Sequence, residues 1–227
     1  MRVAALFSGG KDSTLAAWVA RSQGWDVTHL VTVVPARDDS WMFHVPNLHV
    51  APVLAEAIGL PLVTIESGGE AEREVDDLAR GLEGLDVDGL VAGAVASEYQ
   101  RVRVERVGER LGLKTFTPLW HKPPLEILDT LIAGAFDVRF VAASADGLGP
   151  EWLGRRLTKE SRDALEALAR SKGINPAGEG GEYETIVLDG PLFRSRVEVT
   201  RATPEWRRDR GVWRIEETRL VEKVTAA

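Results

Sequence analysis

Side chains suited to anion chemistry gather in one short segment near the N-terminus, Ser8-Gly9-Gly10-Lys11-Asp12-Ser13. Glycines let the backbone turn tightly and bring its N–H groups close to an anion, and a helix that begins after them adds a partial positive charge. The spacing is not that of the P-loop, G-x-x-x-x-G-K-[ST]. The segment predicts a phosphate-binding loop of a different kind. The structural alternative is a plain strand–turn–helix connection in which Ser8, Asp12 or Ser13 caps the helix.

A second polar segment, Ser97-Glu98-Tyr99-Gln100-Arg101, follows the apolar run 88–95 and begins a predicted helix. Its first residues would lie at the carboxyl end of a strand, where ligands bind in open α/β sheets. Ser97, Gln100 and Arg101 are therefore ligand candidates. The later arginines of this helix alternate with glutamates, which is typical of a solvated face.

A third segment is rich in glycine and carboxylates, Gly178-Glu179-Gly180-Gly181-Glu182-Tyr183-Glu184-Thr185. Its glycines permit close backbone approach, and its carboxylates can hold magnesium, orient an ammonium ion or accept a proton. The alternative is an acidic turn between a helix and a strand.

Strand and helix patterns alternate through residues 1–173, which predicts an α/β fold with a doubly wound, mostly parallel sheet. We expect strands at 3–7, 27–34, 60–66, 88–95, 113–119 and 137–144, and helices starting near Thr14 and Ser97 and spanning 48–58, 70–85, 125–133 and 158–171. Residues 174–227 show β-like segments near 186–188, 194–201 and 212–221, and predict a small C-terminal α+β appendage. The expected domains are 1–173 for nucleotide and 174–227 for substrate.

Composition excludes several classes of protein. The 227 residues are 44% hydrophobic and 28% charged, and no apolar run is long enough for a membrane span, so we expect a cytoplasmic protein. The absence of cysteine excludes disulfides, thiolate zinc sites and cysteine nucleophiles. A net charge of −7 argues against nucleic acid as a partner.

Two further stretches are candidates for contact surfaces rather than for catalytic groups. The connection 35–46 carries Trp41, Met42 and Phe43, which either close over a ligand or pin the connection to the core. The tail from 194 to 219 holds eight arginines and five acidic residues. It is either a basic surface for a macromolecule or an edge strand protected by charge.

These segments with their flanking residues, Val3–Ser13, Gly93–Glu105 and Gly178–Thr185 in this order, resemble those of the diphthine–ammonia ligase family, within the PP-loop ATP pyrophosphatases. The first segment is shared by PP-loop enzymes generally, whereas the second and third distinguish this family. Trp120 and Gly147-Leu148-Gly149 are similar too, while Glu98 stands where the family more often has Asp. The resemblance covers nearly the whole chain and implies amidation of diphthine on translation elongation factor 2, with ATP, Mg²⁺ and ammonium.

The resemblance also implies roles for individual residues. Ser8, Gly9, Gly10, Lys11, Asp12 and Ser13 would hold ATP and the departing pyrophosphate, with Asp12 at the metal. Lys11, Asp12, Glu182 and Glu184 would be catalytic. The acceptor would contact two sets of residues, Ser97, Glu98, Tyr99, Gln100 and Arg101 in the second segment and Glu179, Gly180, Gly181, Glu182 and Tyr183 in the third.

Other functions fit the first loop equally well. A related ligase could adenylate a small carboxylate, and a PP-loop enzyme could modify transfer RNA, although the net charge disfavours the latter. A non-catalytic nucleotide sensor would bind ATP and release neither AMP nor pyrophosphate. A homodimer is compatible with every one of these functions.

Overall fold

A five-stranded parallel sheet forms the N-terminal half of the protein. The computed structural model describes residues 1–35, 46–68 and 71–223. The parallel strands run in the spatial order β3-β2-β1-β4-β5 and are β1 (Arg2–Leu6), β2 (Asp26–Pro35), β3 (Leu62–Ser67), β4 (Gly89–Val91) and β5 (Lys114–Phe116). Strand β1 therefore pairs with β2 on one side and with β4 on the other. The chain reverses its direction of winding at β1, the position where α/β sheets bind ligands.

Helices cover both faces of this sheet because its central strands are apolar on both sides. Val3 and Ala5 of β1 belong to one hydrophobic cluster and Ala4 to another. The first cluster includes side chains of α1 (Lys11–Ser22), α2 (Ala51–Ile58) and α5 (Pro124–Ala133). The second includes side chains of α3 (Ala71–Leu82) and α4 (Glu98–Leu111). The predicted doubly wound α/β fold is confirmed.

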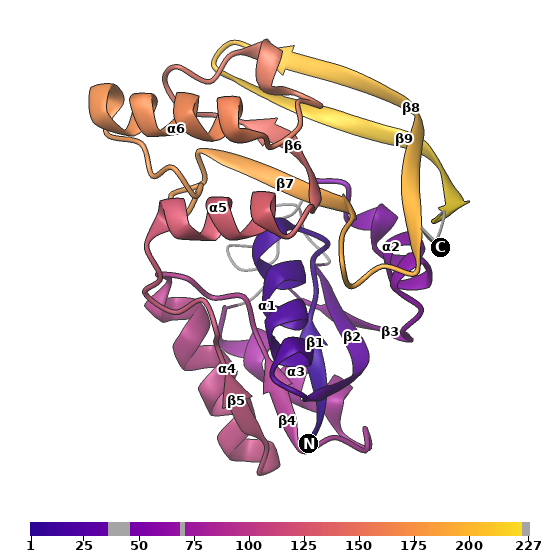
Figure 1. Ribbon diagram of the computed structural model, residues 1–227. Helices are drawn as coiled ribbons and strands as arrows, with labels where there is room; N and C mark the ends of the chain where they lie inside the picture. The colour runs from indigo at the N-terminus through magenta and orange to yellow at the C-terminus, as the bar shows by residue number, and fades with distance from the viewer. Residues whose placement is uncertain (36–45, 69–70, 224–227) are drawn as a thin grey trace.

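The remaining strands form a separate antiparallel sheet in the order β7-β6-β9-β8 (Figure 1). They are β6 (Asp137–Ala143), β7 (Tyr183–Asp189), β8 (Ser195–Arg207) and β9 (Arg210–Glu222), with α6 (Lys159–Lys172) between β6 and β7. Short 3₁₀ turns at Leu48–Val50 and Pro150–Trp152 complete the elements of the described residues.

The prediction of a sixth strand in the parallel sheet was wrong. Residues 137–143 do form a strand, but β6 pairs antiparallel with β7 and β9. Its run Val138–Ala143 is mostly buried, as in a central strand of either sheet, so its apolar pattern does not identify its neighbours. The change of sheet comes between β5 and β6. The division into domains 1–173 and 174–227 stays a prediction.

Helix α1 lies where the two sheets meet. Its core residue Leu15 shares a hydrophobic cluster with Val187 of β7 and Phe140 of β6. The side chain of Asn47, which precedes the 3₁₀ turn before α2, ties that part of the chain to β9, because its amide donates to Trp213 O (2.8 Å) and accepts from Ile215 N (2.9 Å). The antiparallel sheet is thus fixed against the helix that begins at the predicted phosphate loop.

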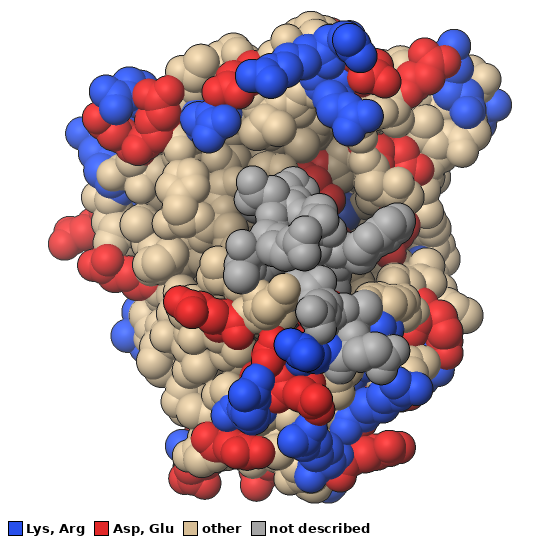
Figure 2. Space-filling view, turned by 180° about the vertical axis from the view of Figure 1, so that it is seen from behind, with Lys and Arg blue, Asp and Glu red and all other residues tan. Residues whose placement is uncertain are grey.

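Acidic and basic side chains are intermingled on the face shown in Figure 2. On the β8–β9 hairpin, Arg201, Arg214 and Arg219 pair with glutamates of the opposite strand. This pairing fits the charged edge strand better than the basic macromolecular surface that was its alternative. Among the described residues, no helix is long and apolar enough to cross a bilayer. The interpretation of Trp41, Met42 and Phe43 concerns residues outside the described ranges.

Candidate active site

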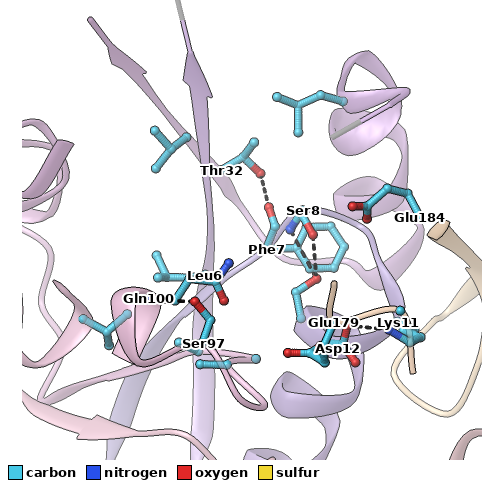
Figure 3. A pocket seen from close by; sticks show the side chains of 18 of the residues that line it. Leu6, Phe7, Ser8, Lys11, Asp12, Thr32, Ser97, Gln100, Glu179 and Glu184 are labelled. Carbon is cyan, nitrogen blue, oxygen red and sulfur yellow. Dashed lines mark hydrogen bonds and ion pairs between the residues drawn. The ribbon is translucent and has the colours of Figure 1, made fainter. Parts of the chain in front are cut away.

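A cavity of about 410 Å³ opens at the carboxyl ends of β1, β2 and β4. Residues from all three sequence segments line it: Ser8, Lys11, Asp12 and Ser13 from the first; Ser97 and Gln100 from the second; and Gly178, Glu179, Gly181, Tyr183 and Glu184 from the third. Figure 3 shows Ser97 and Gln100 across the cavity from Lys11 and Glu184. Its volume lies in the range of small-molecule sites.

The phosphate loop turns at Gly9, which has a φ of +80°. A Cβ on Gly9 would lie 2.5 Å from Leu54 Cδ1, so both the conformation and the packing require glycine here. The loop also bonds to itself, because Ser8 N donates to Ser13 Oγ (3.2 Å) and Gly10 N donates to Ser8 Oγ (3.3 Å). The turn is therefore held by hydrogen bonds within the loop itself.

The N-terminus of α1 has two uncommitted N–H groups. Lys11 N donates to Thr185 Oγ1 of β7 at 3.1 Å, whereas no described residue accepts from Asp12 N or Ser13 N. The first N–H groups of a helix lack intrahelical acceptors and attract anions. The groups left to bind a phosphate are thus those of Asp12 and Ser13.

Lys11 is the cation of the site, and it lies in an acidic environment. Its side chain is 4% exposed, and its Nζ donates to Asp12 Oδ2 at 2.7 Å and lies 5.5 Å from the centre of the Tyr183 ring. Burial alone would lower the pKa of Lys11, but the charges of Asp12, Tyr183 and Glu179 and the hydrogen bond to Asp12 outweigh burial and raise it. Lys11 therefore stays protonated at any physiological pH.

At the start of α4, some residues of the second segment line the cavity and others do not. Ser97 caps the helix by accepting from Gln100 N (3.3 Å), and these two residues line the cavity. Arg101 does not line it; this side chain pairs with Glu98 and Glu105 and lies over the Trp120 ring, 5.2 Å from its centre. Contact of Arg101, Glu98 and the exposed Tyr99 with an acceptor outside the cavity stays a prediction.

Two carboxyl groups of the third segment face the cavity with raised pKa values. Burial is the main cause for both, and the negative charge of Asp12 adds to it. The pKa of Glu184 rises to about 7, although the positive charge of Lys11 acts to lower it. Glu179 also accepts a hydrogen bond from Ala96 N (3.2 Å), which ties the third segment to the second. Glu184 is therefore suited to accept a proton near neutral pH.

Other members of the third segment shape the loop. Both carboxylate oxygens of Glu182 accept backbone hydrogen bonds, from Asn175 N and from Gly180 N, each at 2.8 Å. Tyr183 is buried, and its hydroxyl donates to Pro176 O at 2.7 Å. Neither Glu182 nor Gly180 lines the cavity, so the predicted catalytic role of Glu182 and substrate contact of Gly180 stay predictions without geometric support.

Two positions to which the sequence analysis gave no role hold the segments together. Thr185 was part of the third segment but was given no role, and its hydroxyl is the acceptor for Lys11 N. At Gly93, a Cβ would lie 2.6 Å from the backbone carbon of Asp12, so only glycine lets the end of β4 reach the start of α1. The glycine at position 93 was itself a signal in the sequence, whereas no local pattern distinguishes Thr185 from other threonines.

The site can accommodate a nucleotide with a divalent cation. Asp12 Oδ1 is buried without a hydrogen-bond partner, which fits a carboxylate oxygen that awaits a cation. No group of three acidic or histidine side chains among the described residues forms a metal cage. Magnesium commonly binds through one or two carboxylates, phosphate oxygens and water, so a magnesium site with Asp12 as its protein ligand is compatible with this lining and stays a prediction.

Comparisons with known proteins give matches over both halves of the chain. Residues 1–115 match the family model described as the diphthamide synthase N-terminal domain, and residues 123–221 match that of the diphthamide synthase C-terminal domain. The chain is 36% identical to the diphthine–ammonia ligase of Schizosaccharomyces pombe over 220 residues, 88% of this chain and 36% of that protein. It is also 36% identical to the diphthine–ammonia ligase of Rattus norvegicus, with 88% of this chain and 83% of that protein covered. The chain spans most of the rat protein and about a third of the fission yeast protein, and on these matches it belongs to the diphthamide synthase family.

Proposed function

We propose that the protein is an ATP-dependent ligase that converts the carboxylate of diphthine on translation elongation factor 2 into an amide. The observation that carries this proposal is the convergence of the three segments on one cavity. Phosphate-binding groups lie on one wall, and the carboxyl groups of Glu179 and Glu184 lie beside them. The diphthine–ammonia ligases to which the chain is similar supply the substrate class.

The first half-reaction would activate the acceptor. A carboxylate is a poor electrophile, so its oxygen attacks the α-phosphorus of ATP, and the bond to pyrophosphate breaks. Lys11 and the N–H groups of Asp12 and Ser13 stabilise the charge that develops on the departing pyrophosphate. Magnesium bound at Asp12 would neutralise part of the phosphate charge.

The second half-reaction would form the amide. Ammonia attacks the acyl carbon, AMP leaves with the electron pair of the broken bond, and the nitrogen loses a proton. Glu184 is our candidate for the base, because its pKa of about 7 lets it accept that proton and release it again near neutral pH. Glu179, partly buried beside the same cavity, would hold the ammonium ion while Glu184 takes its first proton and passes it to water, before Glu184 accepts the second proton after the attack.

The proposal is tested by incubating the protein with ATP, Mg²⁺, ammonium and one candidate acceptor at a time. We expect AMP, pyrophosphate and an amide only with elongation factor 2 that carries diphthine. Turnover with a small carboxylate alone would show that the acceptor is a small molecule rather than the elongation factor. Salt-sensitive turnover with transfer RNA would favour RNA modification. Binding of ATP without release of AMP would favour a nucleotide sensor. Release of ADP would contradict cleavage between the α- and β-phosphates.

Variants test the loop directly. Lys11→Ala and Asp12→Ala should abolish acceptor-dependent ATP–pyrophosphate exchange, because they remove a cation of the cavity and a carboxylate whose Oδ1 has no hydrogen-bond partner. Lys172→Ala and Asp146→Ala are matched controls, since they break a surface Lys–Asp pair of similar length, 2.8 Å. Exchange at the wild-type rate in either loop variant would contradict the assignment.

A further inference from the structure

Strand β7 holds the phosphate loop by two hydrogen bonds. Val187 N donates to Gly9 O at 2.8 Å, and Lys11 N donates to Thr185 Oγ1 at 3.1 Å. The first bond joins two backbones and is independent of side-chain identity. The second needs a hydroxyl on β7, and it crosses 174 residues of chain.

The hydroxyl of Thr185 lies in a confined position. Thr185 is 5% exposed, and a Cβ on Gly10 would lie 3.4 Å from Thr185 O and 3.9 Å from Thr185 Oγ1. The loop at Gly10 therefore lies within van der Waals reach of the strand at Thr185. A buried N–H such as that of Lys11 is costly to leave unpaired, so this contact is strongly preferred to an open one.

Glu184, the residue before Thr185, is the proposed base of the second half-reaction. Glu184 lines the cavity from the same strand, one position before Thr185. The charges that act on Glu184 come from Lys11 and Asp12 on α1 and from Glu179 on the loop before β7. Any change in the contact between α1 and β7 must therefore change the distance from Glu184 to Lys11 and Asp12.

We infer that Thr185 is a positioning residue: its hydroxyl holds the phosphate loop at a fixed separation from the Glu184 carboxylate. This inference deepens the proposed function and rests on it for the role of Glu184. The contact commits Lys11 N to the strand and leaves the N–H groups of Asp12 and Ser13 for the phosphates. Thr185 touches no reacting atom in this arrangement.

The test compares wild type with Thr185→Val, which keeps the shape of the side chain and removes the acceptor, and Thr185→Ser, which keeps the acceptor. Thr185→Ala serves alongside Thr185→Val as a smaller side chain without a hydroxyl. Thr203→Val is the matched control, since Thr203 lies on β8 and its hydroxyl donates to Glu216 of β9, and neither residue lines the cavity. Calorimetry measures binding of α,β-methylene-ATP, which requires no turnover.

We expect Thr185→Val and Thr185→Ala to weaken binding of the analogue about tenfold, as for loss of one hydrogen bond with an N–H left unpaired. Thr185→Ser and Thr203→Val should stay within about twofold of wild type. A second readout is the titration of Glu184 by carbon NMR. Its pKa should rise in Thr185→Val as α1 moves away, because the charge of Lys11, which lowers this pKa, acts on Glu184 more strongly than the charge of Asp12, which raises it.

Three results would overturn the inference. Unchanged binding in the folded Thr185→Val and Thr185→Ala proteins would show that the hydroxyl does not position the loop. Equal weakening in Thr185→Ser would assign the effect to packing of the methyl group. A lower melting temperature with an unchanged Glu184 titration would assign Thr185 a role in stability alone. Failure of the ligase function appears separately, as absence of amide formation by the wild type.

Discussion

Replacing Glu184 by glutamine should make the protein more stable at alkaline pH. Burial raises the pKa of Glu184 from 4.5 to about 7, so between these values the native state binds more protons than the unfolded state. Stability then falls as pH rises through this window, and the loss is complete above about pH 7. The Glu184→Gln variant has no ionisable group at this position, so its stability does not fall in this pH window.

The size of the effect follows from the pKa values. Each tenfold change in the dissociation constant corresponds to ~1.4 kcal/mol. A pKa that moves from 4.5 to about 7 therefore costs the native state about 3 kcal/mol at alkaline pH. Lys11 already reduces this cost, while Asp12 and Glu179 add to it.

The assay is urea denaturation of wild type and Glu184→Gln at several pH values, without nucleotide or metal. The difference in unfolding free energy should be about 3 kcal/mol in favour of the variant at about pH 8 and should disappear near pH 4. Glu66→Gln is the matched control, because Glu66 is also on a strand but is exposed. A difference that does not depend on pH, or a variant no more stable than wild type at pH 8, would refute the reasoning.

Two further substitutions test the packing around the loop. Gly93→Ala should abolish ATP binding, measured by calorimetry, because the new Cβ would lie 2.6 Å from the backbone carbon of Asp12. Gly68→Ala is the control and should bind ATP normally, because its Cβ would meet no atom within 4 Å. Tyr183→Phe should lower the unfolding free energy by about 1 kcal/mol, through loss of the hydrogen bond to Pro176 O, while leaving binding of ATP unchanged. A fully active Gly93→Ala protein, or weak ATP binding by Tyr183→Phe, would contradict the geometry.

The local features of the fold were predictable because their signals are local. Gly9 and Gly10 follow a run without polar alternation, and that run forms β1 while α1 begins at Lys11. The helix expected over 158–171 forms as α6, and Thr158, a residue type that favours helix N-caps, caps it by accepting from Ser161 N. In each of these cases a few neighbouring residues determine the backbone conformation.

Features that depend on distant partners were not predictable from the sequence. The pattern of β6 indicates a buried strand, but the sheet it joins is decided by β7 and β9, the second of which begins at Arg210. The role of Thr185 depends on a backbone group 174 residues away. Likewise, nothing in the second segment separates Gln100, which lines the cavity, from Arg101, which pairs with glutamates on its own helix.

The central claim is that the acceptor carboxylate attacks the α-phosphate of ATP in the cavity between the three segments. Its most direct test uses elongation factor 2 whose diphthine carboxylate carries a heavy oxygen isotope, with ATP, Mg²⁺ and ammonium. The account predicts that one heavy oxygen appears in the AMP released, as mass spectrometry would detect, and that Lys11→Ala releases none. Unlabelled AMP, or heavy oxygen in inorganic phosphate together with ADP, would contradict it.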